Sequence, residues 1–453
     1  MKIQLPPKVK YLTDRLEKSG FSAFAVGGCI RNSLLGIPPK DWDICTSAAP
    51  EDIKRCFADL KTIDIGIRHG TVAVLLDGEK YEITTYRIEG VYSDNRRPDS
   101  VSFTDDVKLD LARRDFTVNA MAYNEKSGLV DPFGGREDLK SNLLRCVGDP
   151  DRRFKEDALR IMRAVRFASV YGFEIEQKTS DAVHRNRELL LFIAVERIRE
   201  ELIGLLCGKN VERILNDYRD VLAVFIPELS ECFDFDQRNK HHRFDVFRHI
   251  AHSVSVVKND PLLRLTMLFH DIGKPRACTT DENGCCHFKR HQRISADMSI
   301  TIMRRLRFSC TEIDDVIKLI DYHDVRFSGS KSQVKRLMRV LGADLTKDLF
   351  EIQRADILSQ SDYLREQKLA AVSRAEEQFE EIIEDKEIYQ LKALAVNGDD
   401  LISAGIADGR TIGCVLTMLL DNVIDGIAEN NKNDLLKLAE KYIDSMNLKN
   451  PDL

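Results

Sequence analysis

The amino-acid sequence predicts an α+β protein in which a small strand-rich part precedes a long, almost entirely helical part. Within the first 135 or so residues, short apolar runs such as TVAVLLDG and KYEITTYR indicate strands separated by turns. From about Asp151 onward, apolar residues recur at spacings of three and four, which is the period of amphipathic helices. The boundary is expected in DPFGGREDLKSNLLRCVGDP, a connector punctuated by Gly and Pro.

The bulk composition is that of a soluble globular protein. The chain has 453 residues, of which 43% are hydrophobic and 31% charged, so roughly two to four domains are expected. No apolar run is long enough to cross a bilayer. The eleven cysteines form no CxxC pair, so neither a disulfide framework nor a zinc–thiolate site is indicated, and a reducing cytoplasm is the predicted location. With a net charge of −6, any nucleic-acid site must be a local basic surface.

The run VGGCIRNSLLGIPPKDWDICTSA predicts the first functional site. In a strand, residues two apart point to the same face, so Asp41 and Asp43 project together while Trp42 and Ile44 face a core. Paired carboxylates are hard ligands suited to Mg²⁺, and two such ions can clamp an in-line phosphoryl displacement. The later strand KYEITTYR offers Glu82 as a third carboxylate.

The glycine pair before these carboxylates predicts a phosphate-binding turn. Gly27 and Gly28 let backbone amides approach phosphate oxygens, and Arg31 adds a fixed cation. Taken alone, DxD is more often a strand end at the surface, and GG is more often a plain turn. The ordered set of GGxxR, DxD and a strand glutamate is far more specific, and it indicates a site for Mg²⁺ and a nucleoside triphosphate.

The quoted run, continued in order by RRDFTVNAMAY, DPFGGREDL, EDALRIMRAVRF and ERIREEL, resembles the signature of the class II tRNA nucleotidyltransferases. These are the CCA-adding enzymes, to which the bacterial poly(A) polymerases are related. The tail LAVNGDDLI also resembles theirs. The resemblance implies a polymerase-β-like nucleotidyltransferase head, a small mixed sheet with helices, followed by an all-α neck, body and tail.

The resemblance also places RRDFTVNA in the ribose and triphosphate motif of the family. Arg114 can fork onto a phosphate, and a carboxylate such as Asp115 suits sugar hydroxyls. For each of these residues alone, a surface ion pair is the competing interpretation.

A helical motif follows the connector. DRRFKEDALRIMRAVRFASVYGF is predicted to be one amphipathic helix that ends near Gly172. Asp157, Arg160, Arg163 and Arg166 recur in it at a spacing of three and are expected to form one ridge. An arginine ridge alone is usually a solvated face or a general phosphate binder.

The carboxylate of Asp157 in this ridge suggests that the motif recognises the incoming base. Cytosine and adenine both display an exocyclic amine beside a ring-nitrogen acceptor, so one carboxylate and one guanidinium can bind both bases. Guanine and uracil would leave buried polar groups unpaired, at about 1–3 kcal/mol each. The family uses these positions as a protein template. Asp157 and Arg160 are therefore the predicted base-reading pair, Arg163 and Arg166 are auxiliary, and Glu156 supports them.

Two stretches of sequence help to decide which nucleotides the enzyme adds. DIGIRHGTVAVLLDG resembles the CCA-adding form, whereas bacterial poly(A) polymerases carry a more basic G-R-[RK]-F stretch there. IEGVYSDNRRPDSVSF resembles the flexible loop of enzymes that add all three nucleotides. Addition of C, C and A to tRNA from CTP and ATP is the predicted activity. The alternatives are an A-adding enzyme or a poly(A) polymerase of the same family.

A histidine-rich region predicts a second site, since eight of the ten histidines lie between His241 and His323. A lone histidine in an apolar helix is usually a core residue. Here the order H…HD…H…H…D resembles the HD superfamily of metal-dependent phosphohydrolases, including its two-metal branch. Such side chains would hold divalent ions that activate water against a phosphoester. The predicted ligands are His249, His270, Asp271, His291, His323 and Asp356.

Lys274 is a candidate phosphate contact in this region. No role is predicted for His241, His242 and His252, and His287 is an alternative ligand one turn before His291. A metal-binding module with a second, hydrolytic activity is expected, and the metal's identity stays open. The competing hypotheses are a protein whose main work is hydrolysis of RNA ends or nucleotides at the HD site, and an RNA-binding protein with a decayed head.

The predicted domains are a nucleotidyltransferase head (1–140), a helical neck with the base-reading motif (141–230), an HD domain (235–360) and a helical, tRNA-binding body and tail (361–453). The tRNA is expected along the neck, body and tail, through phosphate contacts. Candidates in the neck are Arg145, Arg152, Arg153 and Lys155.

Overall fold

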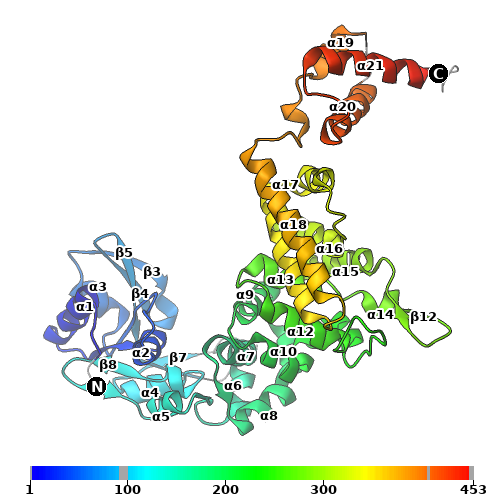
Figure 1. Cartoon of the computed structure of the whole chain (residues 1–453). Helices are drawn as coiled ribbons and strands as arrows, with labels where there is room; N and C mark the ends of the chain where they lie inside the picture. Colours follow the sequence, from blue (N-terminus) through cyan, green and yellow to red (C-terminus); the bar gives the residue numbers. More distant parts are fainter. Residues whose placement is uncertain (1–2, 91–99, 406–408, 448–453) are drawn as a thin grey trace. The chain divides into compact units, whose positions relative to one another are not determined.

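The computed structural model describes residues 3–90, 100–405 and 409–447 (Figure 1). They form two compact units, Met1–Glu231 with Ile302–Phe308, and Cys232–Thr301 with Ser309–Leu453. The first unit holds the main sheet and the second is mostly helical, so the predicted α+β class is confirmed. The four-part division of the sequence stays a prediction. Part of the predicted flexible loop, residues 91–99, lies outside the described residues.

A seven-stranded mixed sheet, in the order β3-β4-β5-β2-β1-β8-β9, forms the centre of the first unit. Only the β2–β5 pair is parallel; the other pairs are antiparallel. The strands are β1 (Ala23–Val26), β2 (Asp43–Thr46), β3 (Lys61–Gly66), β4 (Thr71–Leu76), β5 (Glu79–Thr85), β8 (Ala122–Asn124) and β9 (Gly128–Val130). A separate ribbon pairs β6 (Arg87–Glu89) with β7 (Val101–Phe103). The three-residue strands β8 and β9 are too short to show strand periodicity in the sequence.

Helices and loops cover this sheet and enclose a small core. Helix α1 packs against β1 and β2, and α3 packs against β4 and β5. The buried core includes Phe24, Val26, Tyr86 and Leu111. The helices of this part are α1 (Pro7–Lys18), α2 (Gly28–Leu34), α3 (Pro50–Cys56), α4 (Val107–Ala112) and α5 (Gly135–Lys140).

The helix predicted to run unbroken to Gly172 is two helices, α6 (Pro150–Glu156) and α7 (Leu159–Tyr171). Asp157 between them has an extended backbone (φ −140°, ψ 103°). Its carboxylate accepts a hydrogen bond from the Leu159 amide at 3.1 Å, and such a side-chain bond competes with helix continuation. Gly172 ends α7 in the left-handed region (φ 77°), as the glycine predicted.

The rest of the first unit is helical apart from a two-stranded pair, β10 (Leu143–Leu144) and β11 (Glu174–Ile175). Helix α7 packs against α9, and α6 packs against α8. The remaining helices are α8 (Gln177–Asn186), α9 (Val195–Leu206), α10 (Val211–Asp217) and α11 (Arg219–Phe225).

The second unit is built on a long helix pair, α17 and α18, with a short hairpin, β12 (Thr279–Thr280) and β13 (Cys286–His287), at its side (Figure 1). Val372, Phe379 and Ile382 of α18 pack against Val334 and Phe350 of α17. The helices are α12 (Val246–Val256), α13 (Pro261–Phe269), α14 (Lys274–Ala277), α15 (His291–Arg305), α16 (Cys310–Tyr322), α17 (Lys331–Ser359) and α18 (Arg365–Glu384).

The tail carries its own small core, formed by α19 (Gly398–Ser403), α20 (Gly409–Ile424) and α21 (Lys432–Asn447). Asn397 and Asp400 form a capping box that starts α19 within the LAVNGDDLI run. Among the helices that the structure describes, none combines the length and apolar character required of a membrane span.

Candidate active sites

The glycine turn between β1 and α2 lies against the guanidinium of Arg114. Gly27 has φ +82°, and a Cβ on it would stand 2.7 Å from Nη1 of Arg114, so both conformation and space require glycine. The Nε of Arg114 is buried and has no hydrogen-bond partner among the described residues. Its Nη2 lies 3.6 Å from Oδ2 of Asp110. Arg114 therefore keeps donor capacity for an anion at this turn.

The predicted acidic group is brought together across two neighbouring strands. Ile44 of β2 pairs in register with Ile83 of β5, so Asp43 and Glu82 occupy adjacent positions. Asp41 lies before β2, not within it, so the expectation that both aspartates share a strand face is wrong for Asp41. Ile44 faces the core as predicted.

These carboxylates disfavour one another's charge. The protein atoms around Asp43 raise the pKa of its carboxyl, although the residue is reached by solvent. Arg114 lowers that pKa, and the charges of Glu82 and Asp41 raise it further. A divalent cation would relieve this repulsion, and three carboxylates form the hard-oxygen donor set that Mg²⁺ prefers. The donor set thus fits the predicted ion.

Arg31 is buried, with 5% of its surface exposed, and reaches the neck helix α7. It donates to the Tyr171 hydroxyl at 2.7 Å and to the Asn119 side chain, and its guanidinium lies 4.4 Å from the Tyr171 ring centroid. Its Nη2 also lies 3.6 Å from the position of a Cβ on Gly28. Arg31 therefore stands beside the phosphate turn as predicted, but it also ties α2 to α7.

Asp115 is buried and fully engaged by protein donors. Its Oδ2 accepts from Nη2 and Nε of Arg163 at 2.6 and 2.8 Å, and its Oδ1 accepts from the Asn119 amide at 3.0 Å. Burial acts to raise the pKa of Asp115, but Arg163, Asn119 and Arg160 outweigh it and lower the pKa to about 2. These contacts show that Asp115 positions Arg163, and its predicted ribose contact stays a prediction.

The predicted base-reading residues stand on either side of the α6–α7 break. Arg160 donates to Oε2 of Glu156 and to the Arg113 carbonyl, both at 3.0 Å, so Glu156 holds its guanidinium. The Asp157 carboxylate lies 3.6 Å from Nη2 of Arg197. No role was predicted for Arg197, although it lies in the ERIREEL motif, which could have indicated one.

The auxiliary arginines face α9 and the segment that follows α4. Arg166 is ion-paired with Glu201 of α9, and Arg163 with Asp115. Both guanidinium groups also lie over the Phe167 ring, at 4.5 and 5.1 Å from its centroid. Because Asp157 is outside α7, the predicted four-residue ridge consists of three arginines.

The neck candidates for tRNA contact are mostly engaged in ion pairs. Arg145 pairs with Asp138, whereas Arg152 and Arg153 both pair with Glu156. Lys155 is exposed at the end of α6.

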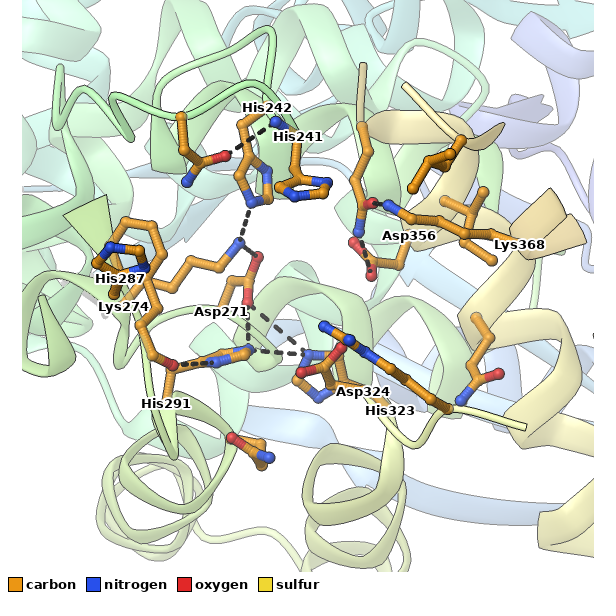
Figure 2. A pocket seen from close by; sticks show the side chains of 18 of the residues that line it. His241, His242, Asp271, Lys274, His287, His291, His323, Asp324, Asp356 and Lys368 are labelled. Carbon is orange, nitrogen blue, oxygen red and sulfur yellow. Dashed lines mark hydrogen bonds and ion pairs between the residues drawn. The ribbon is translucent and has the colours of Figure 1, made fainter. Parts of the chain in front are cut away.

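The six predicted ligands of the histidine-rich region converge from five helices or helix ends. All are buried, and they form two groups that share Asp271. His249 Nε2 lies 3.1 Å from Asp271 Oδ2 and 3.0 Å from Asp356 Oδ1. On the other side, His291 Nε2 lies 3.2 Å from Asp271 Oδ1 (Figure 2). The groups are His249, His270, Asp271 and Asp356, and Asp271, His291 and His323.

Backbone contacts orient the imidazoles toward this centre. The Nδ1 atoms of His270, His291 and His323 lie 2.7, 2.8 and 2.7 Å from main-chain carbonyls three residues earlier. Each Nδ1 can therefore donate to a carbonyl, which turns the Nε2 edge of each ring toward Asp271. Nε2 atoms also approach one another, to 3.2 Å for His249–His270 and 3.3 Å for His291–His323. Imidazole nitrogens gathered this closely around a shared carboxylate form a donor set that fits divalent cations.

A cavity of about 1010 Å³ opens onto this cluster. Lys274, which points into it, is 2.6 Å from Asp271 Oδ2 (Figure 2). The cavity's other basic lining residues are Arg238, Lys240, Lys289, Arg290, Arg326 and Lys368. A basic wall around a metal-competent centre suits a phosphate-bearing ligand.

Two further histidines lie near the cluster, and only His287 departs from a predicted role. His242, for which no role was predicted, lines the cavity with Nε2 at 3.5 Å from Lys274 Nζ, and burial lowers its pKa to about 2. His287 was an alternative ligand, but its Nε2 lies 2.8 Å from Oδ2 of Asp281, outside the cluster. The reason is that His287 lies on the β13 strand, not one turn before His291 on a helix.

Comparison with known proteins assigns separate parts of the chain to domain families. Residues 23–145 match the poly A polymerase head domain, and residues 172–233 match a family described as "Probable RNA and SrmB- binding site of polymerase A". Residues 287–439 match a tRNA nucleotidyltransferase domain 2 family.

Full-length relatives extend this similarity. The chain is 35% identical to the CCA-adding enzyme of Limosilactobacillus fermentum over 98% of its own length and 100% of that protein. With the CCA-adding enzyme of Lactobacillus delbrueckii subsp. bulgaricus it shares 50% identity over 48% of its length, and this match spans about half (54%) of that relative.

Solved structures share the fold over nearly the whole chain. The crystal structure of Bacillus stearothermophilus CCA-adding enzyme in complex with CTP superposes with a TM-score of 0.74 at 27% identity, covering 98% of this chain and 100% of that one. Thermotoga maritima CCA-adding enzyme complexed with tRNA_CCA gives a TM-score of 0.60 at 22% identity, covering 97% and 96%, which is a likeness of fold.

Proposed function

The chain belongs to the family of CCA-adding enzymes, and on this premise we propose that it adds C, C and A to the 3′ end of tRNA, without a nucleic-acid template, from CTP and ATP. The observation that carries the proposal for the first unit is the convergence of Asp41, Asp43 and Glu82 beside the Gly27 turn. Carboxylates next to a phosphate-binding turn are the arrangement that nucleotidyl transfer requires.

Each group at this site has an expected task. Asp41 and Asp43 would hold Mg²⁺, which when bound neutralises triphosphate charge and lowers the barrier to phosphoryl displacement. Glu82 adds negative charge that strengthens this site. The Gly27 turn and the unpartnered Nε of Arg114 supply donors for the triphosphate.

Base choice is assigned to Asp157 and Arg160. Glu156 and the Arg113 carbonyl hold the Arg160 guanidinium in one orientation, which is the fixed geometry that a template needs. Asp157 accepts from the exocyclic amine that cytosine and adenine share, and Arg160 donates to the ring nitrogen beside it. Uracil and guanine would leave these groups unpaired.

The test uses the full chain, Mg²⁺ and a tRNA transcript that lacks its 3′ CCA. CTP alone, ATP alone and both together are supplied, and the products are resolved at single-nucleotide length. Two additions with CTP and a third only with ATP are expected. A long A tail would instead indicate poly(A) synthesis, and ATP addition only to tRNA ending in CC would indicate an A-adding enzyme.

A second activity is supported by the histidine cluster. We infer that its six ligands form an HD-type centre that binds divalent ions and hydrolyses phosphoesters at RNA ends or in nucleotides. The facing Nε2 atoms around Asp271 and the basic cavity wall support this assignment. The bound ions would supply an activated water, and Lys274 is placed to contact a phosphate oxygen.

Two double variants separate the activities. Asp41→Ala with Asp43→Ala is expected to abolish CTP and ATP incorporation and to leave metal-dependent phosphatase activity intact. His270→Ala with Asp271→Ala is expected to do the reverse. Incorporation that survives the first double variant would refute the head-site assignment.

A further inference from the structure

The β12–β13 hairpin presents three metal-binding side chains on one face. Thr280 pairs with Cys286, and the Asp281 amide donates to the Cys285 carbonyl at 3.0 Å, so Asp281 stands across from Cys285. Because side chains alternate along a strand, Cys285 and His287 point to the same side. The hairpin's register therefore gathers Asp281, Cys285 and His287, while Cys286 is buried on the opposite face.

The donor atoms of these three residues are close and ordered. One ligand atom from each lies within 4.8 Å of the others, and His287 Nε2 is 2.8 Å from Asp281 Oδ2. Oδ1 of Asp281 accepts from the amides of Asn283 and Cys285 at 2.9 and 3.0 Å, which fixes the carboxylate and leaves Oδ2 facing the other donors. Solvent reaches the group, so an ion can enter without unfolding.

We propose that Asp281, Cys285 and His287 form a zinc site that is separate from the histidine cluster. One thiolate, one imidazole and one carboxylate are the ligand types that zinc accepts, whereas Mg²⁺ takes no thiolate. Three protein ligands leave a fourth tetrahedral position for water. The spacing D-x3-C-x-H contains no CxxC pair. The hairpin turn, not a helix, brings its three donors together.

The site has a consequence for the neighbouring cavity. Cys285, Cys286 and His287 line that cavity, as do Phe288 and His291, which follow them in the chain. Zinc would link the two strands of the hairpin and hold this wall in place. The proposed role is a structural one for the hairpin, independent of nucleotide addition.

The test is a titration of the metal-stripped full-length protein with Co²⁺. The measured quantity is the thiolate–Co²⁺ charge-transfer band in the near ultraviolet. Thiolate–Co²⁺ charge transfer arises only where a cysteine is a ligand, and the histidine cluster has none. The band is expected to saturate at an intensity that corresponds to one thiolate-bound Co²⁺ per chain, and an excess of Zn²⁺ is expected to remove it. Cys285→Ser should abolish the band, and Asp281→Asn should weaken Co²⁺ affinity at least about tenfold.

The matched control is Cys310→Ser, because Cys310 is an exposed thiol outside the hairpin. This variant and His270→Ala with Asp271→Ala should both keep the band. A wild-type protein without the band, or a Cys285→Ser protein that retains it, would overturn the proposal. Circular dichroism of Cys285→Ser checks that the variant is folded, so that a lost band reports the lost ligand.

Discussion

Asp43 sits where its negative charge is unfavourable unless a cation lies near, because Glu82 and Asp41 repel it and protein atoms crowd it. Asp43→Asn removes one ligand charge while keeping the side chain's size. We expect CTP and ATP incorporation to fall together by at least about 10²–10³-fold, since metal-assisted charge stabilisation is worth several kcal/mol. Single-turnover incorporation into tRNA measures this.

The control for this variant is Asp64→Asn, an exposed aspartate on β3 that pairs with Lys54. It should keep the wild-type rate. An Asp43→Asn enzyme that adds nucleotides at the wild-type rate would show that Asp43 does not serve the reaction.

Asp115 is a buried anion whose partner is Arg163. Asp115→Asn leaves the Arg163 charge without its counter-ion, so we expect a loss of roughly 3 kcal/mol in the free energy of unfolding at pH 7. The folded pKa of about 2 lies below the unfolded value of about 3.9. The stabilisation is therefore complete above about pH 4 and is lost as the pH falls toward 2.

Thermal unfolding of the wild type and of Asp115→Asn across this pH range measures the effect. The difference between the two proteins should shrink as the pH falls from about 4. A difference that is the same at all pH values would contradict an ionised Asp115.

At the scale of elements, the β1–α2 turn couples backbone conformation to Arg114. Gly27→Ala places a Cβ in the left-handed region, at about 1–3 kcal/mol of strain, and pushes the Arg114 guanidinium away. We expect the KM for both nucleotides to rise about tenfold as one phosphate contact is lost. Steady-state kinetics with CTP and ATP check this.

The β4–β5 turn offers a matched control. Gly78 also has a positive φ (+80°), but a Cβ there would meet nothing within 4 Å. Gly78→Ala should be destabilised to a similar degree and keep its KM. Equal KM increases in both variants would mean that strain alone, without Arg114, explains the effect.

At the break between α6 and α7, the Asp157 carboxylate, which we propose reads the base, also accepts a hydrogen bond from the Leu159 amide. Asp157→Asn keeps one side-chain oxygen that can accept from the Leu159 amide. It replaces the other oxygen, an acceptor, by an amino group, which is a donor. We expect discrimination of CTP over UTP to fall at least about tenfold, which corresponds to one unpaired polar group. Competition assays with mixed nucleotides measure it, and unchanged discrimination would exclude Asp157 as a reader.

At the scale of the whole molecule, the two sites belong to different compact units. The histidine cluster joins α12, α15 and α17 with the ends of α13 and α16, so metal binding there should stabilise mainly the second unit. Metal at 100 times its Kd would add about 2.7 kcal/mol to the free energy of unfolding of that unit. Removal by a chelator should lower the calorimetric transition of the second unit more than that of the first.

The His270→Ala, Asp271→Ala protein is the control, and the transition of its second unit should not respond to the chelator. A chelator that shifts both wild-type transitions equally would contradict separate stabilisation of the second unit.

The fold class and the family could be predicted from the sequence, because local spacing and residue type carry them, and the same motifs supplied the candidate site residues. The turn at Gly27 and the helix end at Gly172 follow from backbone preferences within a few residues. Likewise, the order H…HD…H…H…D predicts a group of metal-competent side chains without knowledge of their packing.

The contacts of each side chain could not be predicted from the sequence. Arg31 reaches Tyr171, 140 positions away in sequence, and Asp115 reaches Arg163, 48 positions away, because helices and strands pack across the neck. The α6–α7 break arose where one side-chain hydrogen bond prevailed over helical periodicity. The face shared by Asp281, Cys285 and His287 depends on the register of one hairpin. Such partners are set by packing and pairing between elements, which local sequence patterns do not encode.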